Sequence, residues 1–312
     1  MNNEPANNNR VLRERTPTKP RKSRSSGFSF FLVTLMILAI ALVYVFAGDI
    51  LFPTRDTGMV FPAEGEIVVT FLDVGQGSAV VIRSAENAVL IDGGEFRTRR
   101  VVLDYLHDAR VTRLCYVIAT HPHSDHIGAL PAILRDFEIG RLIKPDFPHE
   151  TDTYLNLLQA IYNNNVAMHF PYQGEQFNAG IIALTVVSQP VATGVSANNA
   201  SIVARLHHGE TAFLFTGDAE AAAESAMIAS GQPLTACVLL VGHHGSNTST
   251  TDAFLAAIAP TAAVIQSGVN NRHGHPHINV LTRLAAHNVT VFRTDELGTI
   301  RKITDGQRIF TG

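Results

Sequence analysis

Apolar residues follow two alternating spacings from about residue 67 onward. Stretches such as Ile67–Asp73 and Ala88–Asp92 are short, rich in β-branched residues and bounded by glycine, which is typical of strands. Arg99–Asp108 instead places Val102 and Leu106 at helical spacing. The pattern predicts strands at 67–73, 78–83, 88–92, 114–119, 181–187, 202–207, 211–215, 236–241 and 262–266, near 142 and 166, and three short strands at the end. It predicts helices at 99–108, 127–137, 154–162, 218–229, 251–258 and 277–286.

Two predicted hairpins decide how these elements are layered. Residues 67–73 and 78–83 are adjacent strands, and so are residues 202–207 and 211–215. Adjacent antiparallel strands argue against the alternative of one doubly wound parallel sheet. Two sheets packed face to face, with helices on both outer faces, bury all of these elements. We therefore expect an α/β fold, an αββα four-layer sandwich.

A second kind of apolar run precedes this domain. Residues 28–47 are twenty residues without a charge, a length that spans the bilayer core of about 30 Å. Seven Lys and Arg precede the run, which indicates that its N-terminal side stays in the cytoplasm. The alternative is a cleaved signal peptide, but no signal-peptidase site stands out after the run. We expect a disordered basic cytoplasmic tail at 1–27, a single transmembrane helix at 28–47 and a linker at 48–66. Residues 67–312 are then a domain outside the cytoplasm, anchored to the cell membrane.

Charge limits the partners of that domain. The first 27 residues hold seven of the 24 Lys and Arg and two of the 27 Asp and Glu, so the rest carries a net charge of −8 with histidine neutral. Such a domain has no general attraction for polyanions. A local basic groove would need some of Arg97, Arg99, Arg100, Arg205, Arg272 and Arg283.

Two cysteines, Cys115 and Cys237, lie in apolar strand-like runs. Export would permit a disulfide. We favour two buried thiols in neighbouring strands.

Metal-ligand side chains are densest directly after the strand predicted at 114–119. His121, His123, Asp125 and His126 fall within six residues there. Imidazole nitrogens and a carboxylate are ligands of divalent transition metals. Because residues two apart on an extended segment point the same way, His121 and His123 can bind one ion together. Asp125 and His126 can then face a second ion.

Other strand ends carry similar side chains. Asp218 follows the strand at 211–215, where it either caps a helix or bridges two metals, and we favour the bridge. His243 and His244 follow the strand at 236–241, and we expect one of them to be a ligand. The loop at 270–277 is also rich in histidine. Asp73 and Asp92 either orient ligand histidines or form turns beside glycines.

These residues resemble a known family. T-H-P-H-S-D-H resembles the H-x-H-x-D-H signature of the metallo-β-lactamase fold. F-L-D-V-G-Q-G-S-A, L-I-D-G-G, N-N-A-S-I-V, F-T-G-D-A, V-G-H-H-G-S and G-H-P-H are similar, in the same order, to blocks of the metallo-β-lactamase domain of ComEC-type DNA-uptake proteins. The resemblance runs from about Val68 to the C-terminus and does not include the multi-span channel region of those proteins.

The resemblance implies a hydrolytic site with two divalent metals. His121 and His123 would bind the first metal, and Asp125, His126 and a C-terminal histidine the second. Asp218 would bridge both. We assign the C-terminal ligand to His243, the first residue after the strand and Gly242, which leaves His244 behind it or facing substrate. Zinc is the expected metal, with manganese as an alternative.

Two positions depart from the family pattern. Many ComEC-type domains have Asp where this chain has His123, and histidine favours zinc. Fully equipped hydrolases of this fold have another histidine where this chain has Asn198-Asn199-Ala200-Ser201. The first metal would therefore be more open or completed by water, and occupancy by a single metal is an alternative.

Water bound to Zn²⁺ has a pKa of about 7, which supplies a metal-activated hydroxide at neutral pH. Asp125 would handle a proton, and His275 or His244 would stabilise the developing oxyanion or protonate the leaving group. We expect an extracytoplasmic phosphodiesterase, with DNA as a candidate substrate and a separate membrane channel protein as a candidate partner. Alternatives are a hydrolase of phosphorylcholine or cell-wall esters, lactones or β-lactams, and a non-catalytic metal-binding surface protein.

Overall fold

The computed structural model describes residues 33–37, 58–189 and 195–312. The described residues from 58 onward belong to one compact unit. The predicted tail and the first part of the linker lie outside the described residues, as does the predicted span at 28–47 apart from the helical residues 33–37. Within the described ranges, no helix is long and apolar enough to cross a membrane.

The described part of the compact unit contains two sheets. The first has eight strands in the order β15-β14-β1-β2-β3-β4-β5-β6. Their bounds are β1 (Ile67–Phe71), β2 (Val80–Arg83), β3 (Ala88–Ile91), β4 (Arg113–Ile118), β5 (Glu138–Ile143), β6 (Met168–His169), β14 (Ile300–Thr304) and β15 (Ile309–Thr311). Strands β3 to β6 are parallel to one another, whereas the other neighbours are antiparallel.

The second sheet has seven strands among the described residues, in the order β13-β12-β11-β10-β9-β8-β7. They are β7 (Gln176–Ala179), β8 (Ile182–Val186), β9 (Ala204–His208), β10 (Thr211–Phe215), β11 (Val238–Leu240), β12 (Ala262–Ile265) and β13 (Thr290–Arg293). Strands β10 to β13 are parallel, and β7 to β10 are antiparallel. Each sheet therefore combines an antiparallel part with a parallel part.

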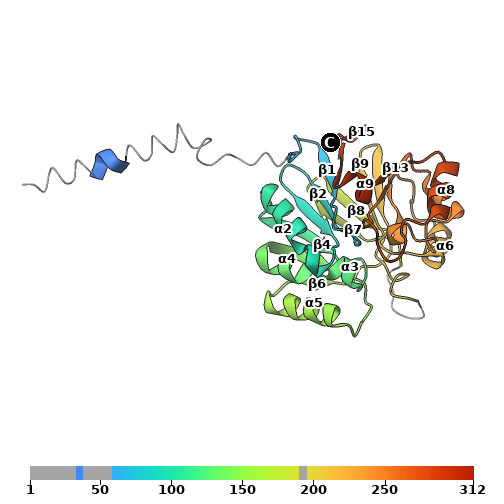
Figure 1. Cartoon of the computed structure of the whole chain (residues 1–312), viewed down its shortest axis with the longest axis horizontal. Coiled ribbons are helices and arrows are strands. Elements are labelled where there is room, and N and C mark those ends of the chain that lie inside the picture. Colours follow the sequence, from blue (N-terminus) through green and yellow to red (C-terminus); the bar gives the residue numbers. More distant parts are fainter. Residues whose placement is uncertain (1–32, 38–57, 190–194) are drawn as a thin grey trace, which may run out of the picture. The chain divides into compact units, whose positions relative to one another are not determined.

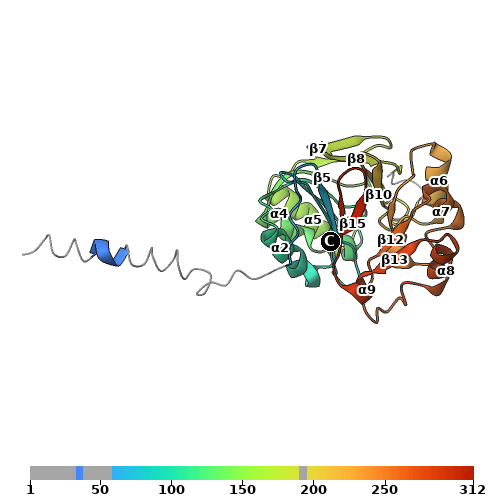
Figure 2. The same ribbon diagram turned by 90° about the horizontal axis from the view of Figure 1, so that it is seen from above.

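Helices cover the outer face of each sheet. One group consists of α2 (Arg99–Asp108), α4 (Leu130–Asp136) and α5 (Asp152–Asn163), with the short α3 (Ser124–Ile127) and η1 (Phe96–Thr98) beside it. The opposite group consists of α6 (Ala221–Ser230), α7 (Asp252–Ile258) and α8 (Ile278–Ala286). Short elements η2 (Gly242–Gly245) and α9 (Thr294–Leu297) complete the set. Figures 1 and 2 show the two helix groups on opposite sides of the sheets.

Alternation along the strands produces three apolar layers. In β3, Leu90 faces the helices of the first sheet, whereas Val89 and Ile91 face the second sheet. In β10, Phe215 faces the first sheet, whereas Leu214 faces the outer helices. Successive strand residues point to opposite faces, so each strand contributes to two layers. Each such fully buried side chain contributes about 1.5–3 kcal/mol. The predicted αββα sandwich is confirmed, and the single doubly wound sheet is wrong.

Several predicted elements differ in detail. The helix predicted at 127–137 is interrupted at Gly128-Ala129, with α3 before the break and α4 after it. The helix predicted at 218–229 begins at Ala221, so Asp218 does not cap it. Strand β7 was not predicted. Cys115 in β4 and Cys237 just before β11 are free, half-buried thiols, rather than buried thiols in neighbouring strands.

The parallel parts of the two sheets position the chemistry. Asp92 follows β3, and the histidine-rich loop follows β4. In the other sheet, Asp218 follows β10, and His243-His244 follow β11. The carboxyl ends of neighbouring parallel strands lie at one edge of a sheet, where ligands of α/β proteins commonly bind. The fold thereby brings segments more than 100 residues apart to one site.

Candidate metal centre

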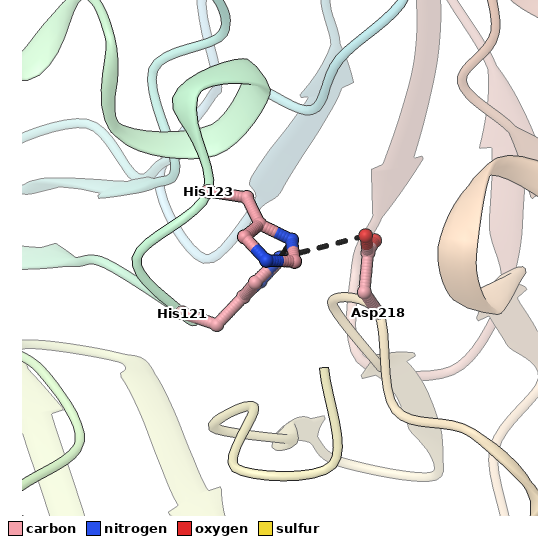
Figure 3. A group of neighbouring side chains, drawn as sticks. All are labelled: His121, His123 and Asp218. Atoms are coloured by element: carbon pink, nitrogen blue, oxygen red, sulfur yellow. Dashed lines mark hydrogen bonds and ion pairs between the residues drawn. The ribbon is translucent and has the colours of Figure 1, made fainter. Parts of the chain in front are cut away.

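The first group of donor atoms comes from both sheets. His121 and His123 follow β4, and Asp218 faces them from the loop after β10 (Figure 3). The Nε2 of His121 lies 3.1 Å from the Nδ1 of His123 and 3.5 Å from the Oδ2 of Asp218. One donor atom from each residue lies within 4.8 Å of the other two. The predicted pairing of His121 with His123 is therefore present in the geometry.

A second group lies on the other side of Asp218. It contains Asp125, His126 and His244, again with donor atoms within 4.8 Å of one another. The Nε2 of His244 lies 3.3 Å from the Nε2 of His126 and 3.3 Å from the Oδ2 of Asp125. Asp125 and His126 occupy the positions expected from the sequence.

Asp218 stands between the two groups and offers one oxygen to each. Its Oδ2 faces His121, whereas its Oδ1 lies 3.1 Å from the Nε2 of His126 and 3.7 Å from the Nε2 of His244. The side chain is buried, and Oδ1 accepts no hydrogen bond from any described residue. A buried carboxylate oxygen without a partner is costly unless a cation neutralises it. The donor set therefore fits divalent metals, with Asp218 as the shared ligand.

Acceptors behind the ligand histidines fix their tautomers. Asp92 Oδ2 lies 2.7 Å from His126 Nδ1, and the backbone carbonyl of Gln266 lies 2.9 Å from His244 Nδ1. Because these acceptors hold a proton on Nδ1, Nε2 is the nitrogen that gives up its proton when a metal binds. Neither sequence spacing nor residue type marked Gln266, because it acts through its backbone.

Thr120 does the same for His121. Its hydroxyl donates to Asp92 Oδ2 over 2.8 Å, so a lone pair on Oγ1 remains for the proton on His121 Nδ1, 3.1 Å away. Asp92 thus supports both His121 and His126 from full burial, as one sequence interpretation predicted. Asp73 instead forms a turn, in which its carboxylate accepts from the backbone N–H of Gly75 at 3.1 Å.

The turn after β11 determines which C-terminal histidine lies beside Asp125 and His126. His244, not His243, belongs to the second group, although His243 comes first after the strand. Both residues have left-handed backbone angles, with φ of 51° and 56°. This turn buries His244 beside Asp125 and leaves His243 half-buried, its Nε2 3.7 Å from the Oδ2 of Asp218.

The carboxylates of the centre are held ionised. Burial by itself raises the pKa of Asp218, but His126, His244 and His121 outweigh it and hold the pKa well below its usual range. Burial also raises the pKa of Asp125, but the hydrogen bond from His244 and the charge of His126 bring it below its usual value. Two negative charges therefore face the donor nitrogens.

The surroundings shift the pKa values of two histidines of the centre in opposite directions. Burial lowers the pKa of His126, yet Asp218 and Asp92 outweigh it and raise the pKa well above its ordinary value. Burial, followed by repulsion from His121, lowers the pKa of His123 to about 4. His123 is consequently neutral at pH 7, the state in which imidazole binds a metal.

A cleft of about 940 Å³ opens over both groups. Its wall includes His275, which Asn271 positions by accepting from the backbone N–H of His275 and donating to its carbonyl. The Nδ1 of His275 lies 3.5 Å from the side-chain amide of Gln76. Burial, then repulsion from His244, lowers the pKa of His275 to about 4. The wall of the cleft also includes Phe96, Arg97, His149 and Arg272.

The arginines that could form a local basic groove gather at the cleft only in part. Of the six candidate arginines, Arg97 and Arg272 line the cleft. Arg99 instead stacks over the ring of Phe96, 4.0 Å from its centroid. Arg205 and Arg283 donate to backbone carbonyls elsewhere in the second half of the chain.

Comparisons with known proteins agree with this geometry. The chain is 31% identical over 257 residues to ComE operon protein 3 of Bacillus subtilis, which covers 77% of this chain and 33% of that protein. It is also 31% identical over 241 residues to Competence protein ComA of Neisseria gonorrhoeae, covering 76% of this chain and 32% of that protein. The chain thus spans about a third of the length of these relatives. The predicted resemblance to the metallo-β-lactamase domain of competence proteins is confirmed.

Solved structures share the fold. The metallo-beta-lactamase fold protein YhfI from Bacillus subtilis superposes with a TM-score of 0.50 at 14% identity, covering 79% of this chain and all of that one. The family model described as "Metallo-beta-lactamase superfamily" matches residues 72–269, a range that contains all six metal-ligand positions predicted from the sequence. Proteins of this fold bind divalent metals and are typically metal-dependent hydrolases. The chain belongs to the metallo-beta-lactamase superfamily.

Proposed function

We propose that this protein is a phosphodiesterase that works with two divalent metals, zinc in the first place. The observation that carries the proposal is the position of Asp218, buried and with one oxygen turned to each donor group. A nitrogen-rich donor set favours zinc over magnesium or calcium, with manganese as the alternative. Occupancy by one metal would leave one oxygen of Asp218 uncompensated.

The donor groups give the ligand assignment. His121 and His123 hold the first metal, and Asp125, His126 and His244 hold the second. Asp218 belongs to both. His244 replaces His243 at the second metal because only its Nε2 lies within reach of both Asp125 and His126.

Bound metals would supply Lewis acidity and lower the pKa of a water molecule to about 7. The roles of the chain's own side chains then differ from the sequence prediction. His244 uses Nδ1 on the Gln266 carbonyl and Nε2 in the second group, so it has no nitrogen left for a leaving group. Asp125 is similarly engaged with His244, which makes it a ligand rather than a proton carrier.

His275 remains as the side chain that acts on the substrate. The amide of Gln76 donates to its Nδ1, which leaves the proton of the neutral imidazole on Nε2. With a pKa of about 4, His275 is uncharged at pH 7. It therefore serves as a hydrogen-bond donor to a developing oxyanion rather than as an acid for the leaving group.

The cleft supports a phosphodiester substrate. Arg97 and Arg272 line it together with several histidines, so its cations gather beside the proposed metals. From the resemblance to DNA-uptake proteins we propose DNA as the specific substrate and a separate membrane channel protein as a partner. The run at 28–47 supports an anchor that places the domain outside the cytoplasm.

Parallel assays of the purified full chain test the proposal. Its metal content is measured by plasma mass spectrometry, and bis(p-nitrophenyl) phosphate, single-stranded DNA and nitrocefin are offered separately. We expect about two metals per chain and turnover of the phosphodiester, lost in Asp218→Asn and after chelation. Turnover of nitrocefin alone would place the protein among β-lactamases. Protein without metal or turnover would leave only a binding role.

A further inference from the structure

His243 belongs to neither donor group, but its Nε2 faces the oxygen of Asp218 that points to the first group. Its Nε2 lies 3.7 Å from the Oδ2 of Asp218, the same oxygen that His121 approaches at 3.5 Å. His244 approaches the other oxygen, Oδ1. The two adjacent histidines therefore stand on the two sides of one bridging carboxylate.

The ring of His243 has acceptors behind it, as the ligand histidines do. Its Nδ1 lies 3.2 Å from the hydroxyl of Thr248 and 3.6 Å from Oε1 of Glu220. The Thr248 hydroxyl is within hydrogen-bond distance of Nδ1, and the Glu220 carboxylate, at ion-pair distance, favours a proton on the same nitrogen. The lone pair of Nε2 is then left toward Asp218. The arrangement matches that of His126, which has Asp92 behind it.

The Asn198-Asn199 pair positions Glu220. Asn199 accepts through Oδ1 from the backbone N–H of Glu220 at 3.1 Å, and its amide lies 3.3 Å from Glu220 Oε2. The amide of Asn198 lies 3.4 Å from Glu220 Oε1. Asn199 also accepts from the backbone N–H of Ala223, so its oxygen is fully engaged and cannot serve as a ligand. The block that lacks a ligand histidine thus orients a carboxylate instead.

The backbone at this point is unusual. His243 and His244 both have positive φ, which costs free energy for residues other than glycine. Backbone hydrogen bonds hold the turn, because His243 donates to the Gly217 carbonyl at 3.1 Å and accepts from Ser246 at 2.8 Å. Strain of this kind persists only where the surrounding structure over-determines the conformation, and it clusters at functional sites. In this turn the side chains of His243 and His244 point to different carboxylate oxygens of Asp218.

We propose that His243 is a ligand of the first metal and replaces the histidine that Asn198–Ser201 does not supply. Glu220 is its positioning residue. The first metal then has His121, His123 and His243 together with Asp218, a set of three imidazoles and one carboxylate typical of zinc. This assignment rests on the proposed function, because it requires that both metals bind.

Metal binding by the full chain tests the assignment without any activity assay. The variants are His243→Asn and Glu220→Gln, with Asp125→Ala as the matched change in the second group. Asparagine tolerates positive φ, so His243→Asn keeps the turn. His287→Ala is the control, since His287 pairs with Asp252 on the surface. Zinc per chain is measured across a chelator series, and cobalt absorption reports the coordination of each site.

We expect His243→Asn to lower the affinity for one of the two zinc ions by at least about tenfold and to change the cobalt spectrum, while the other ion stays bound. Glu220→Gln should weaken the same ion about 10- to 100-fold. Asp125→Ala should lower the affinity for the other zinc ion, and His287→Ala should change the affinity for neither ion. If the unaltered chain binds two ions and His243→Asn binds both with unchanged affinity and spectrum, the assignment is wrong. If the unaltered chain binds no metal, the proposed function itself fails.

Discussion

Asp92 Oδ2 lies 2.7 Å from His126 Nδ1, and both side chains are buried. The same oxygen accepts from the Thr120 hydroxyl, so one carboxylate supports ligands in both donor groups. Asp92→Asn replaces an acceptor with an amide that donates. We expect metal affinity to fall about 10- to 100-fold, measured as zinc retained against a chelator series.

Asp73→Asn is the control for this change. Asp73 also precedes a glycine turn, but its carboxylate accepts from Gly75 and from no described ligand histidine. It should keep its metals. Equal losses in the two variants would mean that Asp92 acts through folding alone, and melting temperatures would then fall together.

The layers of the fold follow from local pattern. In β3 and β10 each residue alternates between two apolar layers, and this period of two is visible in the sequence. The break between α3 and α4 was not predicted, although Pro131 in the first turn of α4 is a sequence signal for the start of a new helix. Strand β7 is short and half exposed, so its apolar signal is weak.

In the candidate site, too, the sequence predicts what is local and misses what depends on tertiary contacts. His121, His123, Asp125 and His126 are close in sequence, so their spacing predicts their grouping. The choice between His243 and His244 depends on two left-handed residues that no spacing rule anticipates. Supporting groups such as Glu220 and the Gln266 carbonyl act across tertiary contacts of 20 residues or more. Sequence therefore identifies ligands more readily than the groups that orient them.

Gly77 allows the β1–β2 turn to pack against the metal loop. A Cβ at this position would lie 2.6 Å from the backbone oxygen of Asp125, which accepts from Ser78 at 3.0 Å. Gly77→Ala should displace Asp125 and weaken the second metal by at least about tenfold. The control is Gly75→Ala, which also has positive φ but no atom within 4 Å of its added Cβ. Metal titration of both variants separates the effect of the contact with Asp125 from the effect of backbone strain. Equal losses of metal affinity in the two variants would exclude the contact as the cause.

His275→Ala should separate chemistry from metal binding. His275 lines the cleft but belongs to neither donor group. We expect both metals to remain, and kcat for bis(p-nitrophenyl) phosphate to fall about 100-fold with little change in KM, the cost of losing one oxyanion donor. His275→Gln, which keeps a hydrogen-bond donor, should recover part of the rate. An unchanged kcat in His275→Ala would remove this residue from the mechanism.

Metal removal should destabilise the fold as well as stop turnover. The two donor groups join loops after β4, β10 and β11, so bound ions link the two sheets. A ligand present at 100 times its Kd stabilises a protein by about 2.7 kcal/mol. For a unit of this size, that corresponds to a melting temperature roughly 5–10 °C higher with zinc than with chelator. Calorimetry of the two forms checks this, and coincident transitions would contradict a structural contribution.

Glu224 provides a pH dependence away from the metal centre. This buried side chain of α6 accepts from the backbone N–H groups of Thr250 and Thr251, the latter at 2.9 Å. Burial raises its pKa above the ordinary value, even though these hydrogen bonds and Arg283 oppose the shift. An acid whose pKa is higher in the folded state binds its proton more tightly there. Its contribution to stability therefore falls as the pH rises from the unfolded pKa through the folded one.

Glu224→Gln removes this titration while it keeps one acceptor for the loop. The free energy of unfolding of the unaltered protein minus that of Glu224→Gln should be larger at pH 4.5 than at pH 7.5. The reason is that the Glu224 carboxyl group loses a proton between these two pH values, whereas the amide that replaces it does not. Urea unfolding at both pH values measures the difference, and metal-ligand titrations cancel in the comparison. The exposed Glu210→Gln tests whether charge alone matters. A difference independent of pH, or one that grows with pH, would show that the Glu224 carboxylate is not destabilised by its burial.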